Sequence, residues 1–525
     1  MQSAEDYYKY CPGEEQLLIS DAVCFGRRRK GFAKCPGCRF NDDEKAGRAG
    51  PTATQPESRA AADQRSDSIK KLFKAYDVRG IHPDPLDEEA AWRIGHAAGS
   101  FLRAALSGMD RADPAACSVV VGRDMRKSSP SLGASLIEGI RSTGAGVIDI
   151  GMIDTSQIYF AINHLGAAGG VQTTASHNPA EYNGFKISGR GAVPIGSDTG
   201  LHDISRIAQN MVPHDTGMQG ELRQLDLTDQ YKAFVRRFLH TPRPMKMVVD
   251  ASNGMAGKWM PILFGDVAEL DLICLNMEHD GEFVHDPNPL VDANLAQLQD
   301  EVLRTGADLG VCFDGDADRC MFVDEHAQIV RCDILTALLA KEFLRVHPGS
   351  AIVFDLRSSR AVAEEITRAG GVPHRERVGH VFMKKAMAES KAIFGGELSG
   401  HFYFRDNFNC DSGMLALAQT LNMLTRTAAS LSDLVKPLLR YAGSGERNFE
   451  NPHADVTLGE LSEIYPDARI DYLDGVTLQF DDWWFNVRKS NTEPLLRLNI
   501  EAVRRDLLDA KLAEITPLLG KPVNY

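Results

Sequence analysis

One pattern occurs three times in this 525-residue chain and constrains its fold more than any other feature. The three segments are SVVVGRDMR from Ser118, KMVVDASNG from Lys246 and SAIVFDLRSS from Ser350. Each is a short β-branched run that ends in a polar turn with an aspartate, and an apolar stretch with helical spacing follows it. A strand, a turn and a helix in this order open an α/β unit with a buried sheet. Because a further strand follows in each region, we predict three related α/β domains in series.

The C-terminal region has a different pattern. The segment DGVTLQFDDWWFNVRKSNTEPLLRLNIEAV contains two alternating strands around a polar loop, and RDLLDAKLAEITPLL has apolar residues at helical spacing. This order is typical of a small α+β domain. We therefore expect α/β domains over residues 69–222, 223–328 and 329–440 and an α+β domain over residues 441–525.

The region before these domains contains four of the ten cysteines. They are Cys11, Cys24, Cys35 and Cys38. The last two form a close pair that can present two thiolates to one zinc ion from a tight turn, whereas the first two lack that spacing. Residues 1–40 are therefore expected to be either a small zinc-bound module or a flexible thiol-bearing extension. Residues 41–68 are polar and poor in aromatic residues, which predicts a flexible linker.

The composition is that of a soluble globular protein, with 43% hydrophobic and 25% charged residues. The net charge of −14 argues against a general nucleic-acid binder, although a few local arginines can still hold an anionic substrate. We find no apolar run long enough for a bilayer and no secretion signal at the start. The other six cysteines are scattered through apolar segments and are expected to be reduced core residues, which favours a cytoplasmic location.

The stretch TTASHNP contains the first candidate nucleophile, Ser176, beside His177. A serine hydrolase of the α/β type would need a Gly-x-Ser-x-Gly elbow, and the chain contains none. Ser176 is therefore either a phosphoryl carrier or part of an ordinary capped turn.

The segment DGDADR follows the apolar run LGVCF and carries Asp314, Asp316 and Asp318. Three carboxylates at alternate positions of an extended loop point to one side and repel one another, so a hard divalent cation such as Mg²⁺ is their expected partner. An EF-hand is excluded because its sixth position holds Arg319 rather than glycine and its flanks are expected to be strands. The phosphatase class that carries Asp-x-Asp-x-Thr/Val after a strand is also excluded, because Asp318 stands where that class needs Thr or Val. The alternative is a solvated acidic turn.

The stretch GGELSGH ends in a third group of polar residues. Glu397 and Ser399 are expected on one side of an extended strand, and His401 continues that face. A carboxylate beside a hydroxyl suits the recognition of vicinal sugar hydroxyls, and a histidine can exchange a proton near neutral pH. The alternative is a strand end with polar decoration.

The segment RKSNTEP is a candidate phosphate site. With Arg497 it offers two guanidinium groups, two hydroxyls, an amide and several backbone N–H groups, but it has no glycine-rich stretch and is not a P-loop. The alternative is a polar hairpin turn. Taken together, the four loops offer a hydroxyl nucleophile, a metal site, a sugar clamp and a second phosphate site that needs no metal. A hydrolase does not need that second site, whereas a phosphoryl shuttle does.

These four loops, in this order, closely resemble the signature of the α-D-phosphohexomutases. The resemblance runs from about Phe73 to Ala502 and includes FKAYDVRG, VGRDMRKSSP, YNGFK, VVDASNG and DPNPL. Within the family, GE-x-SGH and SNTEP are most similar to the phosphomannomutase/phosphoglucomutase branch. Phosphoglucosamine mutases usually have Gln at the position of Leu398 and Gly at that of Asn491. The resemblance implies three α/β domains and a smaller α+β domain around a central cleft.

The resemblance also implies a reaction. The enzyme would interconvert hexose 1-phosphates and hexose 6-phosphates of mannose or glucose through a phosphoserine on Ser176 and a hexose 1,6-bisphosphate. Glucose or mannose 1,6-bisphosphate would act as an activator. Asp314, Asp316, Asp318 and a phosphoserine oxygen of Ser176 would bind Mg²⁺.

Further residues take roles from the same resemblance. Arg79, Lys186, Arg319 and His401 join Ser176 as catalytic candidates, with His401 the favoured base. Arg319 would pair with the phosphoserine, and His177 would orient its loop. The remaining substrate-binding candidates are Tyr76, Arg357, His380, Glu397, Ser399, Arg488, Ser490, Asn491, Thr492 and Arg497. Arg357 stands where relatives often carry Lys.

Two alternatives to a mannose or glucose mutase follow from these residues. The first is a phosphoglucosamine mutase. The second is a catalytically idle sugar-phosphate sensor with the cysteine segment as its output, although the retention of nucleophile, metal ligands and phosphate loop argues against it. The expected partners are hexose phosphates only, with no nucleic acid and no membrane. The sequence leaves a monomer and a dimer equally open.

Overall fold

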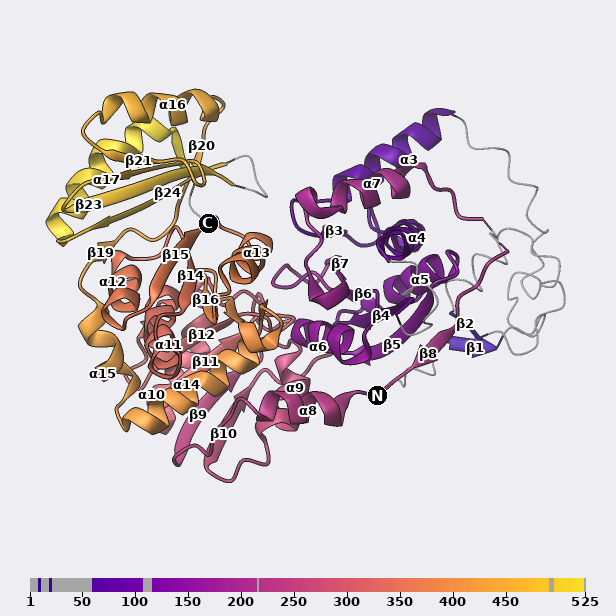
Figure 1. Cartoon of the computed structure of the whole chain (residues 1–525), viewed down its shortest axis with the longest axis horizontal. Helices are drawn as coiled ribbons and strands as arrows, with labels where there is room; N and C mark the ends of the chain where they lie inside the picture. The colour runs from indigo at the N-terminus through magenta and orange to yellow at the C-terminus, as the bar shows by residue number, and fades with distance from the viewer. Residues whose placement is uncertain are drawn as a thin grey trace. The chain divides into compact units, whose positions relative to one another are not determined.

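The computed structural model describes residues 59–106, 116–214, 217–490 and 495–523, together with two short strands near the N-terminus. These strands, β1 (Tyr8–Tyr10) and β2 (Leu18–Ser20), pair antiparallel. Cys11, Cys24, Cys35 and Cys38, the candidates for a zinc module or a flexible thiol-bearing extension, lie outside the described residues. Figure 1 gives the order of the elements.

The chain divides into two compact units. The first contains residues 1–231, 253–259 and 278–287, and the second contains residues 232–252, 260–277 and 288–525. None of the helices in the described residues combines the length and apolar character that a bilayer crossing requires.

The first α/β domain is built on a six-stranded sheet in the order β3-β7-β6-β4-β5-β8. In chain order these strands are β3 (Val78–Ile81), β4 (Ser118–Arg123), β5 (Gly146–Met152), β6 (Gly169–Thr173), β7 (Tyr182–Gly189) and β8 (Leu222–Gln224). Strands β5 and β6 flank β4 in parallel, and β7 runs antiparallel to β6. The second predicted strand of this region is thus confirmed as β5.

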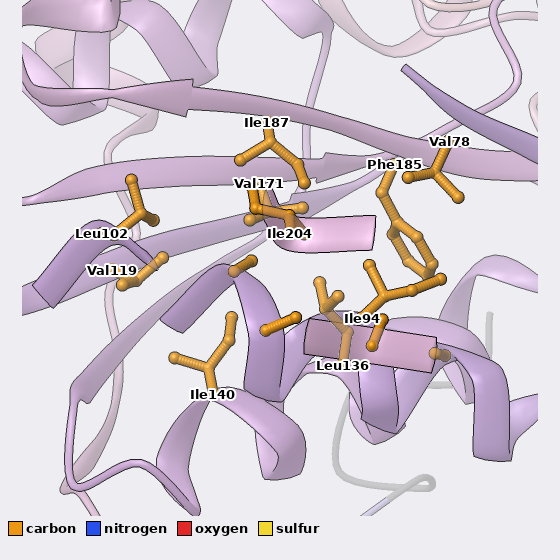
Figure 2. Packing of buried hydrophobic residues seen from close by; sticks show 14 of the residues in the cluster. Val78, Ile94, Leu102, Val119, Leu136, Ile140, Val171, Phe185, Ile187 and Ile204 are labelled. Carbon is orange, nitrogen blue, oxygen red and sulfur yellow. The ribbon is translucent and has the colours of Figure 1, made fainter. Parts of the chain in front are cut away.

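The helices of this domain are α3 (Arg59–Leu72), α4 (Glu88–Ala104), α5 (Ser129–Arg141), α6 (Thr155–Leu165) and α7 (Leu201–Asn210). Helices α4 and α5 cross closely at Gly139. A Cβ added to this glycine would lie only 2.0 Å from the carbonyl oxygen of Trp92, so a larger residue does not fit. Figure 2 shows sheet residues such as Phe185 and Val171 pointing toward helix residues such as Ile94 and Leu136, all fully buried.

Helix α3 corrects one expectation. Residues 59–68 were expected in the flexible linker but are helical. The helix is stabilised by tertiary burial rather than by its polar sequence, since Ile69 and Leu72 of its last turn are fully buried in the core of the first domain.

The second and third α/β domains repeat one sheet topology. Their orders are β10-β9-β11-β12-β13 and β15-β14-β16-β17-β18. In each, the first strand lies between the second and third in parallel, and the fourth is antiparallel to the third. The first domain has the same arrangement in β5-β4-β6-β7. The predicted series of three related α/β domains is therefore confirmed.

The bounds of the second domain's elements are α8 (Thr228–Arg236), β9 (Met245–Asp250), α9 (Ala256–Phe264), β10 (Leu270–Leu275), α10 (Ala296–Thr305), β11 (Leu309–Phe313), β12 (Cys320–Asp324) and β13 (Ile329–Val330). Cys274 on β10 is exposed and is not the core residue that its apolar segment predicted. The reason is that β10 is the edge strand of its sheet.

The third domain contains α11 (Cys332–Val346), β14 (Ala351–Asp355), α12 (Arg360–Arg368), β15 (Val372–Glu376), α13 (His380–Ser390), β16 (Phe394–Gly396), β17 (Phe402–Phe404), β18 (Cys410–Asp411), α14 (Gly413–Thr427) and α15 (Leu431–Val435). The side chain of Ser412 caps α14 by accepting a hydrogen bond from the N–H of Leu415.

The C-terminal domain is an antiparallel sheet in the order β21-β22-β23-β24-β20-β25, with β19 also paired to β24. Its strands are β19 (Ala442–Gly443), β20 (Arg447–Glu450), β21 (Arg469–Asp471), β22 (Val476–Gln479), β23 (Trp483–Lys489), β24 (Leu495–Ala502) and β25 (Lys521–Val523). Helices α16 (Ala454–Ile464) and α17 (Arg505–Leu519) share one core with the sheet. The α+β prediction is confirmed.

Candidate active site

Three of the four candidate loops occupy the same place in the repeated topology. Each is the turn that joins the third strand of the repeated arrangement to the fourth, where β4 counts as the first strand in the first domain. Ser176 lies between β6 and β7, the acidic triplet between β11 and β12, and Glu397 to His401 between β16 and β17. Because the third strand is parallel to the central one, each turn extends from the carboxyl edge of a sheet, where α/β folds usually bind ligands.

The backbone of the Ser176 turn is fixed by a buried arginine. Arg126, in the turn after β4, donates from Nη2 to the carbonyl oxygens of Ser176 (2.8 Å) and Asn178 (2.6 Å). Arg126 is itself held by Asp124, whose Oδ2 lies 3.2 Å from its Nε. The N–H of Ser176 donates to Thr174 Oγ1 (2.9 Å), and Ser176 has a φ of 50°. The turn is thus preorganised before any ligand binds.

Two predicted partners lie at this turn. His177 Nδ1 is 3.3 Å from Ser176 Oγ. Arg79 on β3 donates to Asn178 Oδ1 at 2.6 Å and pairs with Asp77 at 2.5 Å, so the structure brings Arg79 to the serine turn. Two further candidates belong to the same unit and are half-buried: Lys186 on β7 and Tyr76 just before β3.

The acidic triplet converges through a turn. Asp314, Asp316 and Asp318 are at most 2% exposed, and one oxygen from each lies within 4.8 Å of the others. We expected an extended loop, but the chain turns at Ala317, whose φ is 60°, and the N–H of Arg319 donates to Asp314 Oδ1 at 3.2 Å. The turn, rather than strand alternation, therefore gathers the carboxylates. Three buried carboxylates so close together form an oxygen-only donor set that fits a hard cation such as Mg²⁺.

The sugar-loop candidates also lie in a turn, which corrects the predicted strand face. Strand β16 ends at Gly396, and the N–H of Glu397 donates to the carbonyl oxygen of His401. Glu397 is 1% exposed and accepts hydrogen bonds from Tyr403 Oη (2.5 Å) and from the N–H of Gly379 (2.9 Å). Burial would raise the pKa of Glu397, but His401, Arg357 and Tyr403 outweigh it and hold the pKa far below its usual range.

His401 joins the sugar loop to the acidic triplet. Its Nδ1 lies 3.3 Å from Glu397 and 3.1 Å from Ser399 Oγ, and its Nε2 lies 3.5 Å from Asp318. Burial and the nearby Arg319 lower the pKa of His401, but Asp318 and Glu397 raise it to about 9. In the metal-free protein this ring is therefore a proton donor at neutral pH.

His380 and Arg319 lie beside His401. The ring of His380, the first residue of α13, stacks on that of His401 with centroids 6.4 Å apart. Arg319 Nε lies 3.8 Å from Asp314 Oδ2 and 3.2 Å from His401 Nε2. The structure thus brings His380, Arg319 and His401 together within the second unit.

A buried ion pair supports the cluster and was not predicted as part of it. Lys384 Nζ lies 2.8 Å from Asp411 Oδ1, and both side chains are at most 3% exposed. Asp411 Oδ2 is 3.6 Å from His401 Nε2. Burial lowers the pKa of Lys384, but the carboxylate of Asp411 raises it above the ordinary value. Lys384 and Asp411 are distant in the chain, so no local pattern marked the pair.

The predicted phosphate-binding arginines also converge. Arg488 and Arg497 are opposite each other on β23 and β24, and the hairpin between these strands is closed by the N–H of Ser490, which donates to the carbonyl oxygen of Leu495 (2.8 Å). Arg357, in the turn after β14, points its Nη1 toward the same place. Asn491 and Thr492, the other two candidates, lie outside the described residues.

The convergence point is a carboxylate that sequence reasoning missed. Glu446 Oε1 is 3.0 Å from Arg497 Nη1, and its Oε2 is 2.9 Å from Arg488 Nη2 and 3.5 Å from Arg357 Nη1. Burial would raise the pKa of Glu446, but Arg357, Arg488 and Arg497 lower it to about 2. The sequence offers no signal for this role, since GSGERN is an ordinary polar turn.

Comparisons with known proteins agree over all four domains. Family profiles for phosphoglucomutase/phosphomannomutase match in chain order: the first α/β/α domain over residues 70–212, the second over 228–327, the third over 331–441 and the C-terminal domain over 458–517.

Individual relatives match over most of their length. A phosphomannomutase of Salmonella montevideo is 38% identical over 462 residues, which cover 85% of this chain and 98% of the relative. A phosphomannomutase of Escherichia coli K12 is 37% identical over 469 residues, covering 86% and 100%. The crystal structure of a phosphoglucomutase/phosphomannomutase family protein from Burkholderia thailandensis superposes with a TM-score of 0.78 at 32% identity, covering 86% of this chain and 97% of that one.

Proposed function

Because this chain belongs to the phosphoglucomutase/phosphomannomutase family, we propose that it moves a phosphoryl group between the 1- and 6-positions of mannose and of glucose. The enzyme is an intramolecular phosphotransferase that acts on hexose phosphates. The observation that most strongly supports the proposal is the buried acidic triplet, because a fold gains nothing from three adjacent buried carboxylates unless they bind a cation.

Ser176 is the proposed phosphoryl carrier. Arg126 holds its turn through the carbonyl oxygens, so the backbone that carries the hydroxyl stays in place. Arg79 and His177 are proposed to steady the same turn through Asn178 and the hydroxyl. A fixed nucleophile suits in-line phosphoryl transfer, where positioning accounts for most of the catalysis.

The acidic triplet is the proposed Mg²⁺ site. Bound there, Mg²⁺ would neutralise charge on the phosphoryl group during transfer. Arg319 adds a cation at the edge of the same turn and is proposed to pair with the phosphoserine. His401 is proposed as the group that gives and takes the substrate hydroxyl proton, with Lys186 as a second candidate.

The arginine cluster is the proposed grip for the phosphate that does not react. Arg357, Arg488 and Arg497 would hold it, with Ser490, Asn491 and Thr492 from the hairpin. The intermediate, a hexose 1,6-bisphosphate, must turn over so that its other phosphate can react, and both orientations then use one grip. Added glucose or mannose 1,6-bisphosphate is proposed to activate the enzyme by phosphorylating Ser176.

Dual sugar specificity follows from the hydroxyl groups that the sugar loop, Glu397 to His401, is proposed to contact. Glu397 and Ser399 are proposed to hold the 3- and 4-hydroxyls, with His380 of the same unit beside them. Tyr76, in the first unit, remains a proposed substrate-binding residue. Mannose and glucose differ only at carbon 2, which this grip does not contact. No feature of the described residues favours glucosamine phosphate over these two.

Three further proposals concern the chain as a whole. The domain boundaries predicted at residues 69–222, 223–328, 329–440 and 441–525 remain proposals, except that the first domain is proposed to include all of α3 and β8. The six described cysteines have free thiols, which supports a cytoplasmic location. Zinc binding by Cys35 and Cys38 is proposed on their spacing alone and is testable by metal analysis of the purified protein.

The proposed function is tested by a substrate panel. Mannose 1-phosphate, glucose 1-phosphate and glucosamine 1-phosphate are assayed with Mg²⁺ and a trace of glucose 1,6-bisphosphate, using wild type and Ser176→Ala. We expect rapid 1-to-6 conversion of the first two and its collapse in the variant. Turnover of glucosamine phosphate alone would move the enzyme to the amino-sugar branch, and full activity of Ser176→Ala would rule out the phosphoserine.

A further inference from the structure

Glu446 occupies the arginines that the proposed function assigns to a substrate phosphate. It lies in the turn between β19 and β20, and its side chain is 22% exposed. Its two carboxylate oxygens form ion pairs with the guanidinium groups of all three arginines. Asn499 Nδ2 also donates a hydrogen bond to Oε2 at 3.5 Å. A carboxylate and a phosphate offer guanidinium forks the same kind of acceptor oxygens, so the two compete for one set of donors.

The arginines have little freedom to serve both anions at once. Arg357 uses Nε and Nη2 on Asp355, at 3.1 and 3.0 Å, so only its Nη1 faces Glu446. Arg488 is 1% exposed and cannot swing into solvent. A phosphate that binds the Nη atoms now paired with Glu446 must therefore take the place of Glu446 or push it aside.

We propose that Glu446 is a built-in competitor of the substrate phosphate: its carboxylate pairs with Arg357, Arg488 and Arg497 while the grip is empty and yields to the phosphate on binding. This inference rests on the proposed function, because it concerns the same phosphate grip. It adds a residue that sets the affinity of the arginines for the substrate phosphate and the rate at which the phosphate dissociates.

The reaction supplies the reason for such a residue. The bisphosphate must leave the grip and return in the other orientation in every catalytic cycle. If the phosphate left Arg357, Arg488 and Arg497 facing one another with no anion between them, the repulsion among the three cations would slow its release. Glu446 can return to the arginines as the phosphate leaves, so the ion pairs are exchanged rather than broken. The low pKa of Glu446 supports this, since its carboxylate stays charged at neutral pH.

The test compares wild type with Glu446→Gln, which keeps the size of the side chain and removes its charge. With one charge-assisted competitor gone, we expect the KM for glucose 1-phosphate to fall about tenfold. The kcat should fall as well, because the bisphosphate leaves the tighter grip more slowly. The matched control is Glu450→Gln on the adjoining strand β20, a 60% exposed glutamate whose nearest cation is Lys521 at 4.0 Å, and it should change neither constant.

Titration with inorganic phosphate, followed by the thermal unfolding of each variant, measures the grip without turnover. Glu446→Gln should unfold at a lower temperature than wild type without phosphate and gain more stability from phosphate. Arg497→Gln in both backgrounds completes a double-mutant cycle, in which the effect of Glu446→Gln should shrink. If Glu446→Gln does not fold, Glu446→Asp withdraws the carboxylate by one methylene and should lower KM to a smaller extent.

A higher or unchanged KM in Glu446→Gln, or weaker binding of phosphate, would overturn the inference and leave Glu446 as a residue that only positions the arginines. Failure of the proposed function looks different: wild type would then turn over no hexose phosphate. In that case tighter phosphate binding by Glu446→Gln would still support the competitor role at this anion site.

Discussion

Buried charges shape the functional turns at the scale of single residues. Arg126 holds the serine turn through four carbonyl oxygens, those of Ser176, Asn178, Pro179 and Tyr182. Lys384 compensates the buried carboxylate of Asp411. The acidic triplet differs, because like charges face one another there, and its stability must depend on what binds between them.

Replacement of one carboxylate of the triplet tests this dependence. Without Mg²⁺, Asp316→Asn should stabilise the protein by about 1 kcal/mol or more, since it removes one of three like charges that repel one another at close range. Wild type should be stabilised by added Mg²⁺, and the variant should lose most of that gain. Chemical unfolding with and without Mg²⁺ measures both effects.

Asp271→Asn, at an exposed position on β10 of the same domain, is the control and should behave as wild type. A metal-free Asp316→Asn less stable than wild type would contradict the account, as would equal stabilisation of both proteins by Mg²⁺.

The pairing of Glu446 predicts a pH dependence. Its pKa falls from an ordinary 4.5 to about 2 because Arg357, Arg488 and Arg497 outweigh the effect of burial. A depressed carboxyl pKa adds stability above the unfolded value, and this stability is lost as the pH falls toward the folded value. The difference in unfolding free energy between wild type and Glu446→Gln should therefore be constant above about pH 4.5 and shrink toward pH 2. Urea unfolding of both proteins across this pH range measures the difference in unfolding free energy. A difference that shrinks with rising pH would refute the pairing.

Predictability from the sequence varies residue by residue. Ser176 and the acidic triplet were identified because their chemistry is local: a hydroxyl beside a histidine, and carboxylates two positions apart. Arg126, Glu446 and Asp411 were missed because their partners are distant in the chain. Glu446 meets Arg357 and Arg497, which lie 89 and 51 positions away, and no local pattern marks such a contact.

At the scale of elements, the three α/β domains share one type of strand-to-turn junction. An aspartate lies where each of β4, β9 and β14 ends, and its Oδ1 accepts a hydrogen bond from the N–H two residues further on: Asp124 from Arg126 (3.0 Å), Asp250 from Ser252 (2.9 Å) and Asp355 from Arg357 (2.8 Å). The sequence predicted these strand and turn pairs from their repeated pattern. It could not predict that Glu397 lies in a turn, because the short β16 and the residues after it share one polar alternation.

The close crossing of α4 and α5 gives a prediction for elements. Gly139→Ala should destabilise the protein by about 1–3 kcal/mol, because its Cβ would lie 2.0 Å from the Trp92 carbonyl oxygen and the helices must move apart. Gly459→Ala on α16 is the matched control, since nothing lies within 4 Å of the added Cβ. It should stabilise by roughly 0.5–1 kcal/mol through helix propensity. Chemical unfolding measures both, and shifts of the same sign would contradict the packing.

At the scale of the whole molecule, the chemistry is divided between two compact units. The serine turn belongs to the first, whereas the acidic triplet, the sugar loop and the arginine grip belong to the second. The number and class of the domains were predictable, because hydrophobic period and turn residues are local signals. The division into units was not, since residues 253–259 and 278–287 of the second α/β domain belong to the first unit through contacts distant in sequence.

The central claim is that Ser176 carries the phosphoryl group, and the most direct test is to find that group. Wild type and Ser176→Ala are incubated with glucose 1,6-bisphosphate and Mg²⁺, and their peptides are mapped by mass spectrometry. We expect one phosphoryl group on Ser176 of wild type, its transfer to added mannose 1-phosphate, and none on the variant. A phosphoryl group on another residue, or normal turnover with no phosphorylated Ser176, would contradict the account.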